Sequence, residues 1–146
     1  MKPGKVVLDT DVIFDHLTHD RSLLGVQKSV MRKAMSEYFC YTTVFNAVEL
    51  FAMCETPKQK KALEGALSAL KILGLNGKSG RSLGVVLRKA RESNLRDIDT
   101  LIAGLCIESG LPLLTGRPGS YRGIRSLTIL PAKDVKDSAN TELFGA

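Results

Sequence analysis

Residues 6–11, Val-Val-Leu-Asp-Thr-Asp, join a short apolar run directly to two acidic side chains. An apolar run of this length that ends in an acid is typical of a strand buried in a parallel sheet. Residues 12–14 and Leu17 follow at helical spacing, so a short helix is predicted to begin just after Asp9. A carboxylate beside buried apolar residues is costly unless it is paired, hydrogen-bonded or bound to a cation.

Two further segments combine apolar residues with acids in the same way. Residues 43–50 read Thr-Val-Phe-Asn-Ala-Val-Glu-Leu, and residues 97–103 read Asp-Ile-Asp-Thr-Leu-Ile-Ala. Thr43 is a plausible N-cap for the helix that would carry Glu49. If a parallel α/β fold brings the three segments together, their carboxylates would form a site for a hard divalent cation.

The rest of the chain alternates predicted strands and helices. We expect strands at 5–8, 38–42, 111–115 and 126–130, helices after Asp9 and at 21–37, 44–52, 58–73, 81–93 and 97–109, and loops at 74–80 and 116–123. Strands separated by helices favour an α/β fold with a small parallel β-sheet flanked by helices. Functional groups in such sheets gather beyond the carboxyl ends of the strands, which is where Asp9, Glu49 and Asp99 are expected.

Length and composition indicate one soluble domain over residues 1–146. Apolar residues make up 44% of the chain and charged residues 25%, as in ordinary globular proteins. No signal peptide is recognisable, and no apolar run approaches the roughly 18 residues that span a bilayer, so we expect a cytoplasmic protein with no membrane contact. The formal net charge of +6 favours polyanionic partners, of which nucleic acid is the commonest in that compartment.

The three cysteines show no metal-binding pattern. Cys40, Cys54 and Cys106 lie in apolar surroundings and have no Cys-x-x-Cys or Cys/His spacing. Buried, reduced thiols are therefore predicted, and a zinc site is not.

In this order and at these distances, the acidic segments resemble the motifs of the PIN domain, the nuclease fold of VapC-type toxins and related ribonucleases. Residues 7–13 resemble the family's apolar strand followed by Asp-Thr-Asn/Ser. Thr43 with residues 49–50 is similar to its threonine-led helix with an internal acid. Residues 99–103, followed by 110–115, resemble its Asp-x-x-Ile-Ala helix and the next strand. The resemblance covers most of the chain and implies a three-layer PIN-like fold.

The chain departs from the family in its fourth element. Members usually follow the Leu-x-Thr strand with an Arg-Asn pair and then an Asp before an aromatic residue. Here residues 115–121 read Thr-Gly-Arg-Pro-Gly-Ser-Tyr, so Ser120 stands where an acid is expected if Tyr121 takes the aromatic place. Ser120 can hydrogen-bond a metal-bound water but adds no charge. Asp97, two residues before the matched Asp99, is a candidate to compensate.

The resemblance implies a metal-dependent endoribonuclease that uses Mg²⁺ or Mn²⁺ and acts as the toxin of a toxin–antitoxin pair. Asp9 and Asp99 would be the main metal ligands, and Glu49 would complete the cluster or position the attacking water. Asp9, Glu49 and Asp99 are thus the predicted catalytic residues, and Asp97 is a further candidate ligand. The hydroxyls predicted to orient these ligands are those of Thr10, Thr43 and Thr115.

Structural roles compete with the functional ones for several of these residues. Asp97 is also a good helix N-cap, and Asp11 and Asp15 are expected to cap or to be solvated. Two groups of arginines are candidates for contacting RNA phosphates: Arg81, Arg88, Arg91 and Arg96 before the third motif, and Arg117, Arg122 and Arg125 after the third predicted strand.

The resemblance also suggests protein partners. A PIN domain this short often forms a homodimer and is blocked by a small antitoxin protein. Leu23, Leu24 and Met31 are expected to be exposed and available for either contact. The alternative function is a catalytically silent PIN-like domain that binds RNA or serves as a scaffold, and the missing fourth acid favours it.

Overall fold

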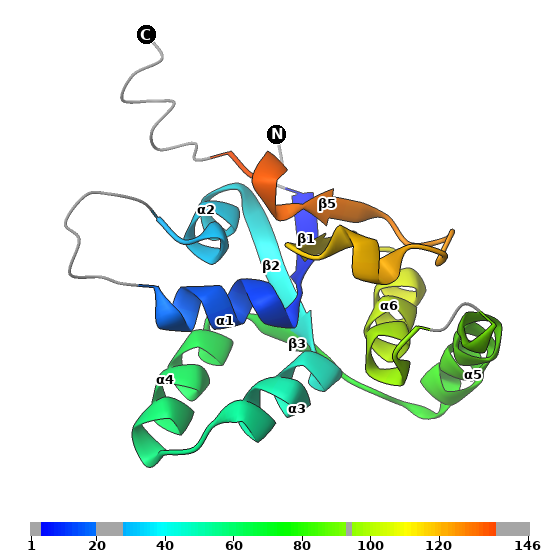
Figure 1. The fold of residues 1–146 in the computed structure, drawn as a ribbon, viewed down its shortest axis with the longest axis horizontal. Helices are drawn as coiled ribbons and strands as arrows, with labels where there is room; N and C mark the ends of the chain where they lie inside the picture. The colour runs from blue at the N-terminus through cyan, green and yellow to red at the C-terminus, as the bar shows by residue number, and fades with distance from the viewer. Residues whose placement is uncertain (1–3, 20–27, 93–94, 137–146) are drawn as a thin grey trace, which may run out of the picture.

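The computed structural model describes residues 4–19, 28–92 and 95–136. Within these residues a parallel sheet of five strands has the order β3-β2-β1-β4-β5, with β1 at its centre (Figure 1). The strands are β1 (Gly4–Leu8), β2 (Tyr38–Thr43), β3 (Lys71–Leu73), β4 (Leu113–Thr115) and β5 (Ile129–Pro131). The predicted parallel α/β sheet is therefore confirmed.

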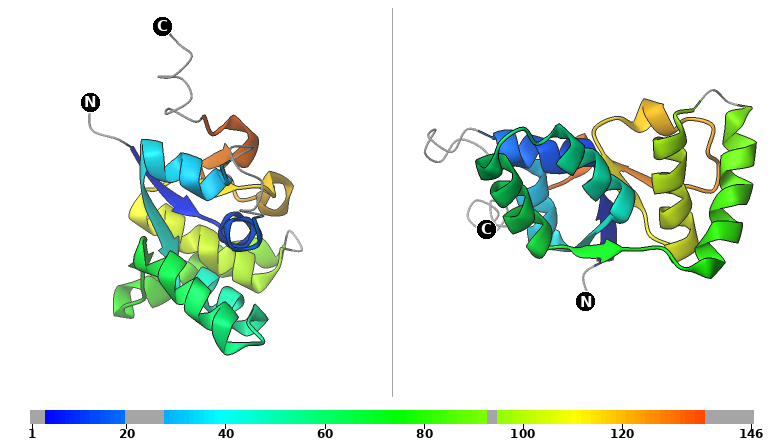
Figure 2. Two further views of the ribbon diagram at one scale, coloured as in Figure 1. Left: turned by 90° about the vertical axis from the view of Figure 1, so that its left-hand side faces the viewer. Right: turned by 90° about the horizontal axis from the view of Figure 1, so that it is seen from below.

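Helices cover both faces of this sheet. The six α-helices of the described residues are α1 (Thr10–Thr18), α2 (Val30–Glu37), α3 (Val44–Met53), α4 (Pro57–Ser68), α5 (Gly77–Arg91) and α6 (Asp97–Ser109). Helices α1 to α4 gather on one side, while α6, with α5 packed against it, lies on the other (Figures 1 and 2). The result is the three-layer arrangement expected from the sequence.

The central strand explains the two cores. Val6, Val7 and Leu8 are all fully buried, as a continuous apolar run predicts for a strand covered on both faces. Because side chains alternate along a strand, Val6 and Leu8 join the core under α1 to α4, whereas Val7 joins the core under α6. Asp9 follows at the carboxyl end of this strand and is the N-cap of α1.

Two elements differ from the sequence-based expectation between α4 and α5. The predicted helix at 58–73 ends at Ser68, and Lys71–Leu73 forms β3 because it pairs with Thr42 and its neighbours on β2. The predicted loop at 74–80 is also wrong in its second half, since α5 begins at Gly77. Asn76 caps this helix through a capping box with Ser79, which outweighs the glycines that suggested a loop.

The last two strands are shorter than predicted. Leu111 donates its N–H to the carbonyl of Cys106 over 3.0 Å, so it closes the end of α6 instead of beginning β4. The strand predicted from Ser126 begins at Ile129, because a turn bond joins Leu127 N–H to the carbonyl of Ile124. The predicted loop at 116–123 contains a 3₁₀ helix, η1 (Pro118–Tyr121). A second 3₁₀ helix, η2 (Ala132–Asp134), follows β5.

The predicted helix at 21–37 is only partly within the described residues. Its described part begins at Val30, where Ser29 accepts a hydrogen bond from Arg32 N–H as the N-cap. Met31 is 1% exposed and belongs to the core, so the expectation that it offers a surface contact is wrong. Leu23 and Leu24 lie outside the described residues.

Two general expectations can also be compared with the structure. All three cysteines are free thiols as predicted, but the expected burial holds only for Cys106, because Cys40 and Cys54 are half-buried. Among the helices of the described ranges, none combines the length and apolar character needed to cross a bilayer.

Candidate functional site

Asp9 lies at the centre of a polar cluster at the carboxyl edge of the sheet, and its carboxylate is fully buried. Its Oδ1 accepts hydrogen bonds from Thr10 N–H at 2.8 Å and from Asn46 Nδ2 at 3.1 Å. Its Oδ2 accepts from the hydroxyls of Thr115 at 2.8 Å and Tyr121 at 2.9 Å. These donors come from α1, α3, β4 and η1, so the fold itself fixes the carboxylate and compensates its burial.

Asp99 is held at the start of α6 and is 2% exposed. Arg96 binds it in a bidentate pair, with Nε 2.9 Å from Oδ2 and Nη2 2.8 Å from Oδ1. A second arginine joins the two buried acids, because Arg117 Nη2 lies 3.4 Å from Asp9 Oδ2 and 3.5 Å from Asp99 Oδ1. The structure thus brings Asp9 and Asp99 to one common cation.

Glu49 enters the same network from α3. Its Oε1 accepts a hydrogen bond of 2.7 Å from the hydroxyl of Thr10, which itself accepts one from Asn46 Nδ2 at 3.0 Å. Its Oε2 lies 3.6 Å from Arg96 Nη2. The three acids expected to act together are therefore linked: Glu49 shares Arg96 with Asp99, and Asp99 shares Arg117 with Asp9.

The predicted supporting hydroxyls all lie in this network. Thr10 orients Glu49, and Thr115 donates to Asp9. Thr43 acts one step further away, as the N-cap of α3 in a capping box with Asn46, as its position in the sequence predicted. The side-chain amide of Asn46 in turn donates a hydrogen bond to Asp9 and so connects this cap to the carboxylate.

Asp97 has a different position from the other acids. It is the first residue of α6, and the N-cap is Arg96, so the prediction that Asp97 caps this helix is wrong. The reason is that Arg96 has the extended backbone of a cap while its side chain turns to Asp99. Asp97 is exposed, its side chain makes no hydrogen bond or ion pair with another described residue, and its role as a ligand stays a prediction.

Asp11 is more enclosed than expected, whereas Asp15 is exposed as predicted. Asp11 Oδ2 accepts a hydrogen bond of 2.9 Å from Gly116 N–H, but Oδ1 is buried and has no hydrogen-bond partner. Burial, with the nearby charge of Asp9, raises the pKa of Asp11 above its ordinary value. Asp11 is therefore not fully solvated, and it is not the N-cap of α1, which is Asp9, so the expectation that it caps a helix or is solvated is wrong.

The donor set suits a hard divalent cation in its chemistry. The site has four carboxylates but only the two positive charges of Arg96 and Arg117. The carboxylates are those of Asp9, Asp11, Glu49 and Asp99, and Oδ1 of Asp11 has no hydrogen-bond partner. Within the described residues, no three acidic, histidine or cysteine side chains are arranged to enclose an ion. Mg²⁺, however, usually keeps several waters and needs only one or two carboxylates. The pair formed by Asp9 and Asp99 fits that requirement.

Sequence reasoning missed the contacts that four residues make at the site. Asn46 is fully buried, and its only signal was its place three residues after the capping Thr43. Tyr121 was noted as an aromatic position but not as a hydrogen-bond donor to Asp9. Arg96 and Arg117 were considered only as candidates for contacting RNA phosphates, yet their guanidinium groups pair with the acids. Ser120 is half-buried, and its N–H donates to the carbonyl of Arg117 over 3.0 Å.

Comparison with known proteins rests on structure, because no family model and no curated protein matches this sequence significantly. VapBC2 from Rickettsia felis, bound to a DNA fragment from its promoter, matches with a TM-score of 0.70 over 87% of this chain and 98% of that chain. The fold is that of the VapC-type PIN domain. DNA-bound VapBC from Salmonella typhimurium matches with a TM-score of 0.70 over 88% and 98%, and FitAcB from Neisseria gonorrhoeae with 0.63 over 88% and 99%.

These PIN-domain neighbours are 16%, 17% and 15% identical to this chain, so the likeness is one of fold. It covers nearly the whole of each neighbouring chain. The fold expected from the three motifs is thereby confirmed, and the motifs lie where a PIN-domain sheet ends.

Proposed function

We propose that this protein is a metal-dependent endoribonuclease that hydrolyses RNA phosphodiester bonds and is the toxin of a toxin–antitoxin pair. The observation that carries the proposal is the convergence of buried Asp9 and Asp99 on one cation, Arg117, at the carboxyl edge of a PIN-domain sheet. Burying two carboxylates side by side is costly, and a divalent-cation site gives that arrangement a use.

Asp9 and Asp99 would hold the Mg²⁺ or Mn²⁺ ion, and Glu49 would complete the site directly or through a water. Asp97, on the same helical turn as Asp99, is a further candidate ligand. A bound ion of this kind lowers the pKa of a coordinated water and neutralises charge that develops on a phosphate.

The chain's own residues prepare the acids for this task. Asn46, Thr115 and Tyr121 donate hydrogen bonds to Asp9 and so fix its orientation. Thr10 positions Glu49 on the neighbouring helix. The side chains of Arg96 and Arg117 are paired with the acids but are 56% and 35% exposed, so their positive charge also attracts the RNA backbone.

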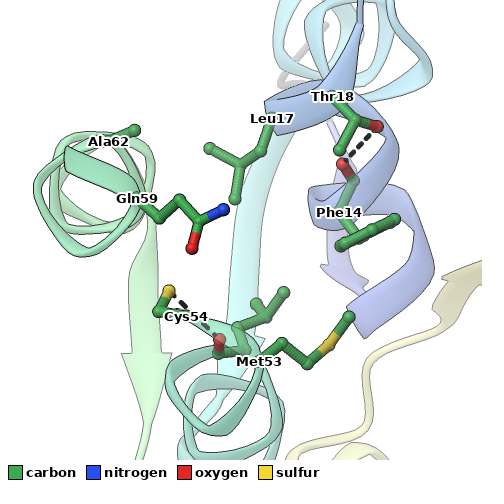
Figure 3. A pocket seen from close by; sticks show the side chains of 8 residues that line it. Phe14, Leu17, Thr18, Met53, Cys54, Gln59 and Ala62 are labelled. Atoms are coloured by element: carbon green, nitrogen blue, oxygen red, sulfur yellow. Dashed lines mark hydrogen bonds between the residues drawn. The ribbon is translucent and has the colours of Figure 1, made fainter. Parts of the chain in front are cut away.

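A toxin needs a partner that blocks it, and the molecule has an apolar pocket suited to one. The pocket, of about 180 Å³, lies between α1, α3 and α4 (Figure 3). Phe14 and Met53, at its rim, are 43% and 48% exposed. The neighbours of this fold include a toxin–antitoxin complex from Klebsiella pneumoniae, so we propose that an apolar segment of a small antitoxin protein covers the pocket. A homodimer stays a prediction.

A cleavage assay tests the proposed activity. Purified protein is incubated with structured and unstructured RNA in Mg²⁺, in Mn²⁺ or with a chelator. We expect metal-dependent cutting that Asp99→Asn lowers at least about 100-fold, the scale for a group that holds a reacting centre. Asp15→Asn, which removes an exposed acid, is the matched control and should cut like the wild type. Asp97→Asn reports whether that acid belongs to the site.

A second function has its own supporting observation. Arg96 and Arg117 already neutralise part of the acidic cluster, and Ser120 replaces an acid expected in the family, which favours a silent RNA-binding or scaffold domain. RNA binding with no cleavage in either metal would select this alternative. Growth arrest on induction in a competent host, lost in Asp99→Asn, would select the toxin.

A further inference from the structure

Arg117 and Arg96 hold the acids with different strength. Arg96 contacts Asp99 through two short bonds of 2.9 Å and 2.8 Å. Arg117 contacts Asp9 and Asp99 through a single nitrogen at 3.4 Å and 3.5 Å, near the outer limit of hydrogen bonding. The attraction of Arg117 to the acids is therefore mainly electrostatic and can be replaced by another cation at little cost in hydrogen bonds.

The backbone of Arg117 is anchored while its side chain can leave. Its N–H donates to the hydroxyl of Thr115 over 3.0 Å, and η1 begins at the next residue, Pro118. The Arg117 side chain is 35% exposed, so the guanidinium has solvent on one side and the buried acids on the other. The guanidinium is therefore not fully enclosed by the protein.

We propose that Arg117 is an internal counter-ion that competes with the divalent cation for Asp9 and Asp99, an inference that rests on the proposed function. In the metal-free protein its charge stabilises the two buried carboxylates. When the cation binds, Arg117 moves to the mouth of the site, where its guanidinium is placed to bind an RNA phosphate. Arg96 stays paired with Asp99 in both states.

Thermodynamic linkage gives this exchange two measurable consequences. A group that stabilises only the metal-free state must weaken cation binding by the same free energy. Removing the charge of Arg117 should therefore destabilise the metal-free fold and tighten metal binding. A purely structural role for Arg117 predicts the loss of stability but no gain in affinity.

Calorimetric titration of the full chain with Mn²⁺ measures the competition without any assay of activity. We expect Arg117→Gln to bind Mn²⁺ about tenfold more tightly than the wild type, which corresponds to ~1.4 kcal/mol. Its melting temperature without metal should be lower, and Mn²⁺ should raise it by more than in the wild type. Arg117→Lys keeps the charge but loses the planar fork, so its Mn²⁺ affinity should lie between those of the wild type and Arg117→Gln.

Controls separate the exchange from a general change of charge. Arg122→Gln removes an exposed cation close to Arg117 in the sequence that makes no ion pair with a described acid, and should titrate like the wild type. Asp9→Asn combined with Arg117→Gln should abolish the tight binding. If Arg117→Gln does not fold, the affinity of Arg117→Lys still decides between exchange and a structural role.

The outcomes distinguish this inference from the proposed function. Equal or weaker Mn²⁺ binding by a folded Arg117→Gln, with binding by the wild type intact, would overturn the exchange and leave the metal site standing. Absence of Mn²⁺ binding in the wild type and in both Arg117 variants would overturn the exchange and the proposed metal site together.

Discussion

The side-chain amide of Asn46 donates a hydrogen bond of 3.1 Å to Oδ1 of Asp9 and so ties the first turn of α3 to the end of β1. The same amide nitrogen donates to Thr10 Oγ1 at 3.0 Å, and the amide oxygen accepts from Thr43 N–H at 3.1 Å. One fully buried side chain thus connects two strand ends, a helix cap and a proposed metal ligand.

Replacing Asn46 should therefore cost more stability than a cap usually does. We expect Asn46→Ala to lower the free energy of unfolding by about 1.5–3 kcal/mol, because a buried carboxylate loses a donor. Urea denaturation measures this loss. Gln59→Ala is the matched control, since Gln59 has the same place in the capping box of α4 but is exposed. An equal loss in both variants would show that burial beside Asp9 adds nothing.

Tyr121→Phe tests the donor on the other oxygen of Asp9. Burial and then the charges of Asp9 and Asp99 raise the pKa of the Tyr121 phenol well above its ordinary value, so it stays a donor up to strongly alkaline pH. Removing it should lower the free energy of unfolding by about 1.5–3 kcal/mol. As the pH is raised, the phenolate absorbance of the folded wild type should increase by the same amount as that of the folded variant. Extra absorbance in the wild type before unfolding would contradict the assignment.

Gly104→Ala tests the packing of α5 on α6. A Cβ at Gly104 would clash with Cδ2 of Leu83, a buried residue of α5. Because Leu83 or the helix must move, we expect a loss of about 1–3 kcal/mol by thermal or urea unfolding. Gly84→Ala is the control, because a Cβ there meets nothing within 4 Å. A Gly104→Ala variant as stable as Gly84→Ala would mean that the two helices are not in close contact.

The buried thiol of Cys106 predicts a stability change at alkaline pH. Burial, with the charge of Asp9, raises the pKa of Cys106 from 9.0 to about 12. Folding therefore favours the protonated thiol, and this contribution to stability is complete below pH 9.0 and is lost as the pH rises towards about 12. Denaturation at several pH values should show that the free energy of unfolding falls less over this pH window for Cys106→Ala than for the wild type. Identical slopes for the two proteins would contradict the burial of this thiol.

The sequence was sufficient for the central strand and for the acids that follow it. A continuous apolar run at residues 6–8 requires burial on both faces, and an acid directly after it can only lie at the strand end. Thr43 was recognisable as a cap because it precedes a helical apolar pattern. These local signals depend on neighbouring residues alone, and they placed Asp9 and Glu49 correctly on their elements.

The parts that sequence reasoning missed depend on contacts between distant residues. Lys71–Leu73 has too few residues to show a strand period, and it is a strand because β2 is beside it. The bond from Asn46 to Asp9 spans 37 residues, and that from Tyr121 to Asp9 spans 112. The pairing of Arg117 with both acids likewise requires the loop after β4 to meet α6. No local pattern encodes these meetings.

The most direct test of the central claim is the rate of RNA cleavage in Mn²⁺ by the wild type and by Asp9→Asn, purified in parallel and with their folding checked by melting temperature. Asp9 is the hub of the proposed site, accepting hydrogen bonds from α1, α3, β4 and η1. We predict metal-dependent cleavage by the wild type and a rate at least about 100-fold lower for a folded Asp9→Asn. Equal cleavage by the two proteins would contradict the account.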